Sequence, residues 1–166
     1  MRGIERRMDA ITLLRNDHRA VEKLFKTFEK AKDTRAKADA VSQFVPELSV
    51  HSAIEEQVFY PAVRAEVPEA EGMVLESLEE HHIVKWVLSE LDGMSPDDEA
   101  FEAKATVLIE NVRHHVEEEE QELFPEVRAA LGRKRLAEIG ERMEQAKKRA
   151  PRRPQPRADA SRAAAS

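Results

Sequence analysis

The sequence predicts an all-α fold, an up-down-up-down four-helix bundle, and three observations lead to this prediction. Glycine contributes only 5 of 166 residues, and the abundant residues are helix formers such as alanine, leucine, glutamate, lysine and arginine. Apolar residues recur at steps of three and four in four long segments, as they do on the buried face of a helix. The second pair of segments repeats the first, which is typical of two packed helical hairpins.

The first two helices are expected between Asp9 and Val67. Asp9 is a suitable N-cap for the first helix, whose apolar stripe is interrupted by one histidine. The second helix is expected from about Arg35 to Val67, with Pro46 and Pro61 inside it. Because proline removes a backbone donor, we expect local kinks or breaks, which would divide this segment into shorter helices.

Two further long helices and a short one are expected in the second half. The third helix is predicted over about residues 69–91, after a proline. The fourth is predicted to begin near Pro96 or Asp97 and to stop near Gly132. A short fifth helix is expected over about residues 133–148, packed outside the bundle or frayed.

We expect the chain to divide into a bundle over residues 1–131, a C-terminal helix over residues 132–149 and a disordered basic tail over residues 150–166. Residues 147–166 contain seven Lys or Arg residues and one Asp, a net charge of +6. Since the whole chain carries −6, the remainder carries −12. The tail has almost no large apolar side chain, which predicts disorder. The acidic body argues against nucleic acid as the main partner.

Several classes of protein are excluded by what the sequence lacks. Without cysteine, it has no disulfide, thiolate metal site or cysteine nucleophile. No apolar run approaches the roughly 20 residues that span a bilayer. The first ten residues lack the apolar core of a secretory signal. We therefore expect a cytoplasmic protein without a membrane partner, either a monomer or a weak homodimer.

Polar residues interrupt all four apolar stripes. The first and third helices each contribute one histidine, and the second and fourth each contribute a His-x-x-x-Glu pair. Positions four apart share one face of a helix, so both members of a pair can point inward. Burying two carboxylates without a counter-charge is unfavourable, and a pair of metal ions would supply that charge. The candidate metal ligands are His18, His51, Glu55, His81, His115 and Glu119.

Each half of the chain contains the same three blocks. Residues 17–21, 51–55 and 59–63 resemble residues 80–84, 115–119 and 123–127, at offsets of 63 or 64 residues. The motifs Asp17-His18-Arg19, His51-x-x-x-Glu55, Glu80-His81-His82 and His115-x-x-x-Glu119 resemble the haemerythrin, or HHE cation-binding, family. The resemblance covers about residues 9–130. It implies two iron ions with an oxo or hydroxo bridge, both glutamates bridging the ions and the four histidines as terminal ligands.

The chain departs from the oxygen carriers of that family at one position. Where the resemblance implies a fifth histidine, four residues after His81, the chain has Lys85. Four histidines and two bidentate carboxylates supply eight of the twelve bonds of two six-coordinate ions, so positions stay open for solvent, a small ligand or further side chains. Glu22, Glu56, His82 and His114 are the candidates among the side chains. His114 is also the main alternative to His115, which we prefer because it follows Val112 on the apolar stripe.

These observations leave four functions open. We favour a di-iron protein that binds or senses O₂, NO or peroxide, because open positions let such ligands reach the metal. The alternatives are a catalase-like enzyme that decomposes hydrogen peroxide, an iron-sensing or iron-holding module without turnover, and a metal-free interaction protein. Manganese or zinc would accept similar donors. Tyr60 is expected to pack through its ring rather than to line the site, and Trp86 to lie in the core or an interface.

Overall fold

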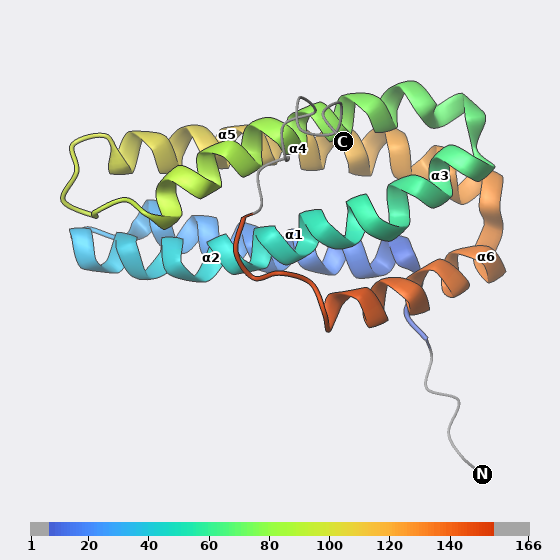
Figure 1. Cartoon of the computed structure of the whole chain (residues 1–166), viewed down its shortest axis with the longest axis horizontal. Coiled ribbons are helices and arrows are strands. Elements are labelled where there is room, and N and C mark those ends of the chain that lie inside the picture. The colour runs from blue at the N-terminus through green and yellow to red at the C-terminus, as the bar shows by residue number, and fades with distance from the viewer. Residues whose placement is uncertain (1–6, 155–166) are drawn as a thin grey trace, which may run out of the picture.

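The computed structural model describes residues 7–154, and four long helices form the predicted bundle (Figure 1). These helices are α1 (Ala10–Lys30), α2 (Thr34–Ile54), α4 (Glu71–Asp92) and α5 (Phe101–Glu118). A π-helical turn η1 (Glu55–Phe59), α3 (Tyr60–Glu66) and a 3₁₀ turn η2 (Pro68–Ala70) connect α2 to α4. A second π-helical turn, η3 (Glu119–Leu123), connects α5 to α6 (Phe124–Lys147). Across residues 7–154, no helix is long and apolar enough to cross a membrane.

The helix starts in the first hairpin follow from side-chain caps. The Asp9 carboxylate accepts a hydrogen bond from the backbone N–H of Thr12 at 2.9 Å, which confirms Asp9 as the first N-cap. Asp33 accepts from the N–H of Ala36 at 2.8 Å and caps α2 in the same way. Each cap satisfies an N–H that has no partner within the helix.

The second predicted helix is divided into α2, η1 and α3, as expected, but the break lies near Pro61 alone, and Pro46 lies within α2 without ending it. One predicted boundary is wrong. The fourth bundle helix begins at Phe101 rather than at Pro96 or Asp97. Before it, the Asp98 carboxylate accepts from the N–H of Ala100 at 2.8 Å, so a local turn replaces the first helical turn.

The two π-helical turns occupy equivalent places in the repeat. Each begins at the glutamate of a His-x-x-x-Glu pair, Glu55 or Glu119, whose carbonyl accepts a bond from the N–H five residues later. One residue separates the end of each turn from a proline, Pro61 or Pro125. Proline lacks an N–H and clashes with the carbonyl four residues earlier in a regular helix. The wider turn relieves that conflict, and such turns often mark functional sites.

The C-terminal helix reverses direction and packs against the bundle. At Gly132, α6 has φ 73°, a left-handed conformation that glycine adopts without steric cost. The segment after it runs back beside α1 (Figure 1), and Leu136, Ile139 and Met143 are fully buried. This confirms the fifth helix. Residues 155–166, most of the predicted disordered tail, lie outside the described residues.

The apolar core consists of two clusters with a polar layer between them. One cluster contains Leu14, Val74 and the returning part of α6, and the other contains Val21, Phe44 and Val84. In α1, His18 lies between these clusters, between Leu14 and Val21 along the chain. Trp86 is 57% exposed, so the expectation of a core position is wrong.

We predict that Gly140→Ala destabilises the fold. A Cβ at this position would lie 2.3 Å from the Met8 carbonyl oxygen and 2.8 Å from the backbone nitrogen of Ala10, so backbone must move. Overpacking of this kind costs about 1–3 kcal/mol. The matched control is Gly72→Ala in α4, where a Cβ meets nothing within 4 Å and helix propensity favours alanine by roughly 0.5–1 kcal/mol. Urea unfolding of both variants checks this prediction, and equal stability changes would contradict it.

Candidate metal centre

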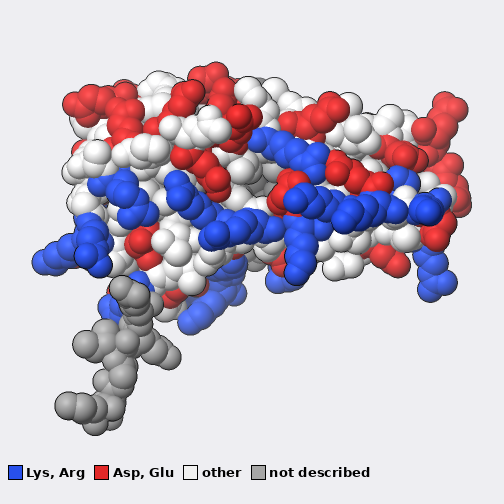
Figure 2. Space-filling model, turned by 180° about the vertical axis from the view of Figure 1, so that it is seen from behind, with Lys and Arg blue, Asp and Glu red and all other residues white. Residues whose placement is uncertain are grey.

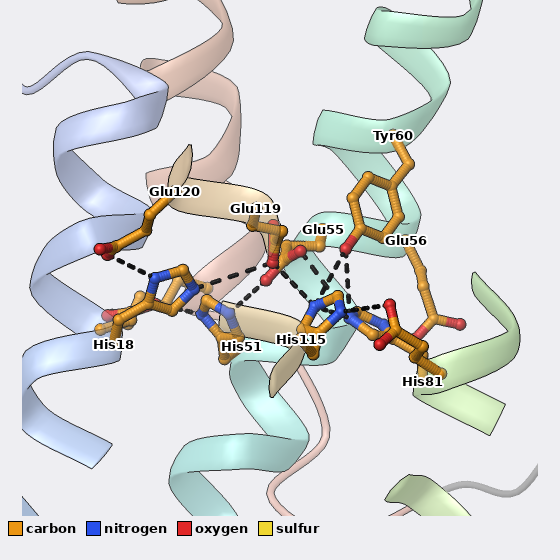
Figure 3. Close-up of polar contacts among 12 residues, drawn as sticks. His18, His51, Glu55, Glu56, Tyr60, His81, His115, Glu119 and Glu120 are labelled. Carbon is orange, nitrogen blue, oxygen red and sulfur yellow. Dashed lines mark hydrogen bonds and ion pairs between the residues drawn. The ribbon is translucent and has the colours of Figure 1, made fainter. Parts of the chain in front are cut away.

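All six predicted ligands converge in the polar layer of the bundle (Figure 3). They form two overlapping groups, and within each group the candidate ligand atoms lie within 4.8 Å of one another. Both groups contain both glutamates. The first consists of His18, His51, Glu55 and Glu119, and the second of Glu55, His81, His115 and Glu119. Each of these residues is at most 6% exposed.

Helical spacing and the π-helical turns position these side chains. His51 and Glu55 form an ion pair four residues apart along α2 and η1. His115 Nε2 lies 2.8 Å from Glu119 Oε1 across the equivalent junction of α5 and η3. His18 is held by α1 and His81 by α4, each on the buried face of its helix.

Each glutamate also reaches the histidine of a more distant helix. Glu119 Oε1 lies 3.8 Å from His18 Nε2, and Glu55 Oε2 lies 3.8 Å from His81 Nε2. Each carboxylate therefore faces histidines from both groups, which is the geometry that a bridging ligand requires.

Six of the donor atoms at the centre have no hydrogen-bond partner in the described structure. Among the described residues, this holds for both carboxylate oxygens of Glu55 and of Glu119, and for Nε2 of His18 and of His51. The Nε2 atoms of His51 and His115 lie at ion-pair distance from Glu55 and Glu119, but these contacts lack hydrogen-bond geometry. Buried polar atoms without partners are unfavourable, and one of the usual reasons for them is an ion that is absent from the coordinates. The donor set thus fits metal cations, since all of these atoms can ligate a metal.

In the metal-free protein, the shifted pKa values of His51, His115 and Glu55 show that the centre favours positive charge on the imidazoles. Burial alone would lower the pKa of His51, but the carboxylates of Glu55 and Asp17 outweigh burial and raise it to about 10. The pKa of His115 is likewise raised well above its usual value, against burial, mainly by Glu119. Burial raises the pKa of Glu55, yet the facing histidines hold it well below its usual value. Protons on His51 and His115 therefore supply charge that metal ions would bring.

A ring of outer carboxylates orients the four histidines. Each imidazole contacts a carboxylate through Nδ1, which leaves Nε2 directed toward the centre (Figure 3). An acceptor on Nδ1 fixes the tautomer that exposes the Nε2 lone pair, as in many metal-bound histidines. The pairs are His18 with Glu120 at 2.9 Å, His51 with Asp17 at 3.2 Å, His81 with Glu56 at 3.2 Å and His115 with Glu80 at 3.1 Å.

Comparison with known families supports this interpretation of the site. The family described as "Hemerythrin HHE cation binding domain" matches residues 9–127. The chain belongs to this family. The haemerythrin-like domain thus accounts for the whole bundle, including both π-helical turns and all six converging residues.

Individual relatives agree with the family and the fold. A protein of Nostoc sp. named a DNA nickase is 30% identical over 124 residues, or 75% of this chain, which spans only 35% of that relative's length. An uncharacterised haemerythrin-like protein of Schizosaccharomyces pombe is 29% identical over 136 residues, covering 81% of this chain and 67% of the relative. The crystal structure of an HHE domain-containing protein from Mycobacterium kansasii has the same fold, with a TM-score of 0.71, 24% identity and coverage of 86% and 89% of the two chains.

The outer carboxylates follow a rule set by the repeat of the haemerythrin-like domain. Within each half, the acid before the first histidine, Asp17 or Glu80, contacts the second histidine of that half. The acid after each central glutamate, Glu56 or Glu120, contacts the first histidine of the other half. Three of these roles were not predicted from the sequence, and Glu56 was expected as a candidate ligand. The signal that could have revealed these roles is that acids occupy equivalent positions in the two halves, Asp17 with Glu80 and Glu56 with Glu120.

The alternative ligands all lie outside the two groups. Glu22 pairs with Arg113 at 2.9 Å, and His82 is exposed. His114 is exposed and contacts Glu118 at 3.1 Å, so the structure brings His115, and not His114, to the centre. Glu56 contacts His81 Nδ1 and Lys85 rather than the central atoms.

Tyr60 lines the site, so the expectation that it only packs through its ring is wrong. Its hydroxyl lies 3.2 Å from His81 Nε2 and 3.4 Å from His115 Nε2 (Figure 3). Burial, followed by the charges of Glu119 and Glu55, raises the pKa of this hydroxyl well above its usual value.

The repeat places a different residue at the position equivalent to Tyr60. In the second half this residue is Phe124, 64 residues later, and its ring stacks on His18 with centroids 5.9 Å apart. A hydroxyl therefore faces only the group that contains His81 and His115. The two groups of candidate ligands therefore differ in the number of possible donors.

We predict that Glu120→Gln lowers metal affinity by roughly 10–100-fold without unfolding the protein, because His18 loses the carboxylate that orients it. Glu117→Gln is the control, since Glu117 is exposed and contacts only Gln121. Competition with a metal chelator measures both affinities. Equal affinities for the two variants would show that the outer carboxylate has no such role.

Proposed function

We propose that this haemerythrin-like domain is a non-haem di-iron protein that binds or senses a small oxidant ligand, namely O₂, NO or peroxide. The observation that carries the proposal is the pair of four-donor groups that share Glu55 and Glu119. Imidazole and carboxylate donors without thiolate suit iron. When bound, a pair of iron ions supplies a Lewis-acidic, redox-active centre. The chain's own residues determine which ligands reach it.

The unequal groups indicate where an external ligand would bind. The group with His81 and His115 has the Tyr60 hydroxyl as an additional donor. The group with His18 and His51 has the phenyl ring of Phe124 instead, and so keeps more open coordination positions. Lys85, at the position of the fifth histidine in oxygen carriers, pairs with Glu56 at 2.8 Å and stays outside the central groups. We assign the ligand position to the His18–His51 side.

A cavity beside the four histidines suits a ligand of very few atoms. Its volume is about 20 Å³, and apart from the imidazoles its walls are mainly apolar, including Val84 and Leu48. A larger groove of about 360 Å³ lies outside it, and the two spaces share His18, Val21, Val112 and Val116. A cavity of this size holds about one water-sized molecule, so it favours diatomic ligands or peroxide over organic substrates.

One observation supports a second candidate, a peroxide-decomposing enzyme. The groove that reaches His18 is also lined by Glu120 and Gln121, which could hydrogen-bond hydrogen peroxide. Oxygen evolution from hydrogen peroxide by the iron-loaded protein would favour this enzyme. A spectrum of an oxygen adduct that reverses on deoxygenation would favour reversible binding, and large loss of helix on iron removal would favour an iron-sensing module.

We predict that His115→Ala greatly reduces iron content, because it removes a terminal ligand, and that Glu119→Ala abolishes the paired site, because it removes a bridge. His114→Ala is the matched control, because His114 is adjacent to His115 in the sequence but is exposed and contacts Glu118 instead of the centre. Metal analysis of purified protein should give about two irons per chain for the parent and His114→Ala proteins, as expected for a two-metal site. Loss of iron from the His114→Ala protein alone would overturn the ligand assignment.

We predict that Tyr60→Phe removes a visible absorption band from the ferric protein while iron content stays unchanged. A phenolate bound to ferric iron absorbs visible light, and the Tyr60 hydroxyl lies within 3.4 Å of both histidine nitrogens of its group. Azide binding should persist, because the open positions lie on the opposite, His18 side. An unchanged spectrum would show that Tyr60 does not ligate iron.

A further inference from the structure

A narrow acidic pocket connects the surface to one of the two central glutamates. It lies between α4 and the start of η3, has a volume of about 40 Å³ and includes Glu76, Ser77, Glu118, Glu119 and Glu122 in its walls. Glu76 and Glu122 are exposed, and Glu118 is half-buried. Glu119 is 1% exposed, and neither of its oxygens has a hydrogen-bond partner in the described structure. Carboxylates therefore line this pocket from the solvent to the buried carboxylate of Glu119 at the centre.

Two of the three outer carboxylates of this pocket lack a cationic partner among the described residues, and the third, Glu118, pairs with His114. Across residues 7–154, Glu76 and Glu122 form no ion pair. At the mouth, Glu118 also belongs to a third group of candidate ligands, with Glu80 and His114, whose ligand atoms lie within 4.8 Å of one another. An imidazole among carboxylates makes this group a better cation site than acidic residues alone.

The first half of the repeat has no counterpart to this acidic pocket. The positions equivalent to Glu76, Glu118 and Glu122 are Leu13, Ile54 and Val58, which are all buried. These three residues pack in the same apolar cluster as Leu136, Ile139 and Met143 of the returning part of α6. The C-terminal helix therefore closes one side of the centre, and the acidic pocket remains on the other.

The groove beside His18 is less suited to cations. Arg19 and Arg113 line it together with Glu22, Glu117 and Glu120, and two of these carboxylates are already paired, Glu22 with Arg113 and Glu120 with His18. Along α1, exposed basic residues recur at steps of three and four, at Arg15, Arg19, Lys23, Lys26 and Lys30. Figure 2 shows Lys and Arg side chains in a band across this face, with most of the visible acidic side chains above it. A cation approaching along this basic row of α1 meets like charge. The acidic pocket instead attracts a cation and offers oxygen atoms that can replace its water ligands.

We propose that this acidic pocket is the route by which ferrous iron reaches the buried centre, and that Glu80, His114 and Glu118 hold the ion temporarily at its mouth. This inference rests on the proposed di-iron function. It assigns Glu76 and Glu122 to metal uptake and not to the finished centre. Small neutral ligands, in contrast, use the groove between α1 and α5.

The test compares rates of iron uptake by the metal-free full-length protein under anaerobic conditions. Ferrous iron is mixed rapidly with protein, the reaction is stopped with a strong ferrous chelator, and protein-bound iron is counted against time. The double variant Glu76→Gln with Glu122→Gln should take up iron about tenfold more slowly at low ionic strength, because electrostatic attraction accelerates association by at least about that factor. Its final iron content should equal that of the parent protein. Added salt should slow the parent protein toward the rate of the variant.

The matched control is Glu99→Gln with Glu110→Gln, which removes the same charge from exposed positions away from the pocket. This control should keep the parent rate, and His114→Ala should lose only the earliest, rapidly bound iron. An unchanged rate in the Glu76–Glu122 variant would overturn the proposal, and so would equal slowing in both double variants. If the parent protein bound no iron at all, the proposed function itself would fail, which is a distinguishable result.

Discussion

The structure depends on two buried carboxylates that have no hydrogen-bond partners of their own. Glu55 and Glu119 lie at the middle of the bundle, between two apolar clusters and among four imidazoles. Ionised carboxylates at such a place are tolerated only with nearby positive charge. In the metal-free protein, protons on His51 and His115 supply it, because the nearby carboxylates raise the pKa of both imidazoles. Bound metal cations would supply it in the loaded protein. The outer carboxylates and the π-helical turns serve to hold this arrangement, since they set the direction of each imidazole and each glutamate.

The two halves of the chain share a scaffold but differ in what surrounds it. The repeat gives each half one histidine, one His-x-x-x-Glu pair, one π-helical turn and two outer acids. Two features around this shared set differ between the halves. Tyr60 of the first half corresponds to Phe124 of the second, and the returning part of α6 covers only one side of the centre. Because the metal-binding scaffold is symmetric but its surroundings differ, small external ligands and incoming metal ions can use different sides of the centre. Lys147, at the end of α6, donates to Asp17 at 2.6 Å and so connects the covering helix to the layer around His51.

The sequence predicted the bundle and the six converging residues because both depend on periodicity, which helical geometry converts directly into position. The same periodicity explains why His115, rather than His114, lies at the centre. The start of α5 was missed because a local turn of short polar residues competes with helix there. The role of Tyr60 was missed because it depends on the π-helical turn before it, which shifts the phase of the helix and turns the hydroxyl toward the centre. The outer carboxylates depend on contacts between helices, which spacing within one helix does not reveal.

The most direct test of this account is an anomalous diffraction map of the iron-loaded protein, recorded at the iron absorption edge. The account predicts two iron peaks about 3.5–4 Å apart, as in other two-metal sites, each between two of the histidines and both in contact with Glu55 and Glu119. One peak in contact with only one glutamate, or two peaks without a shared carboxylate, would contradict it.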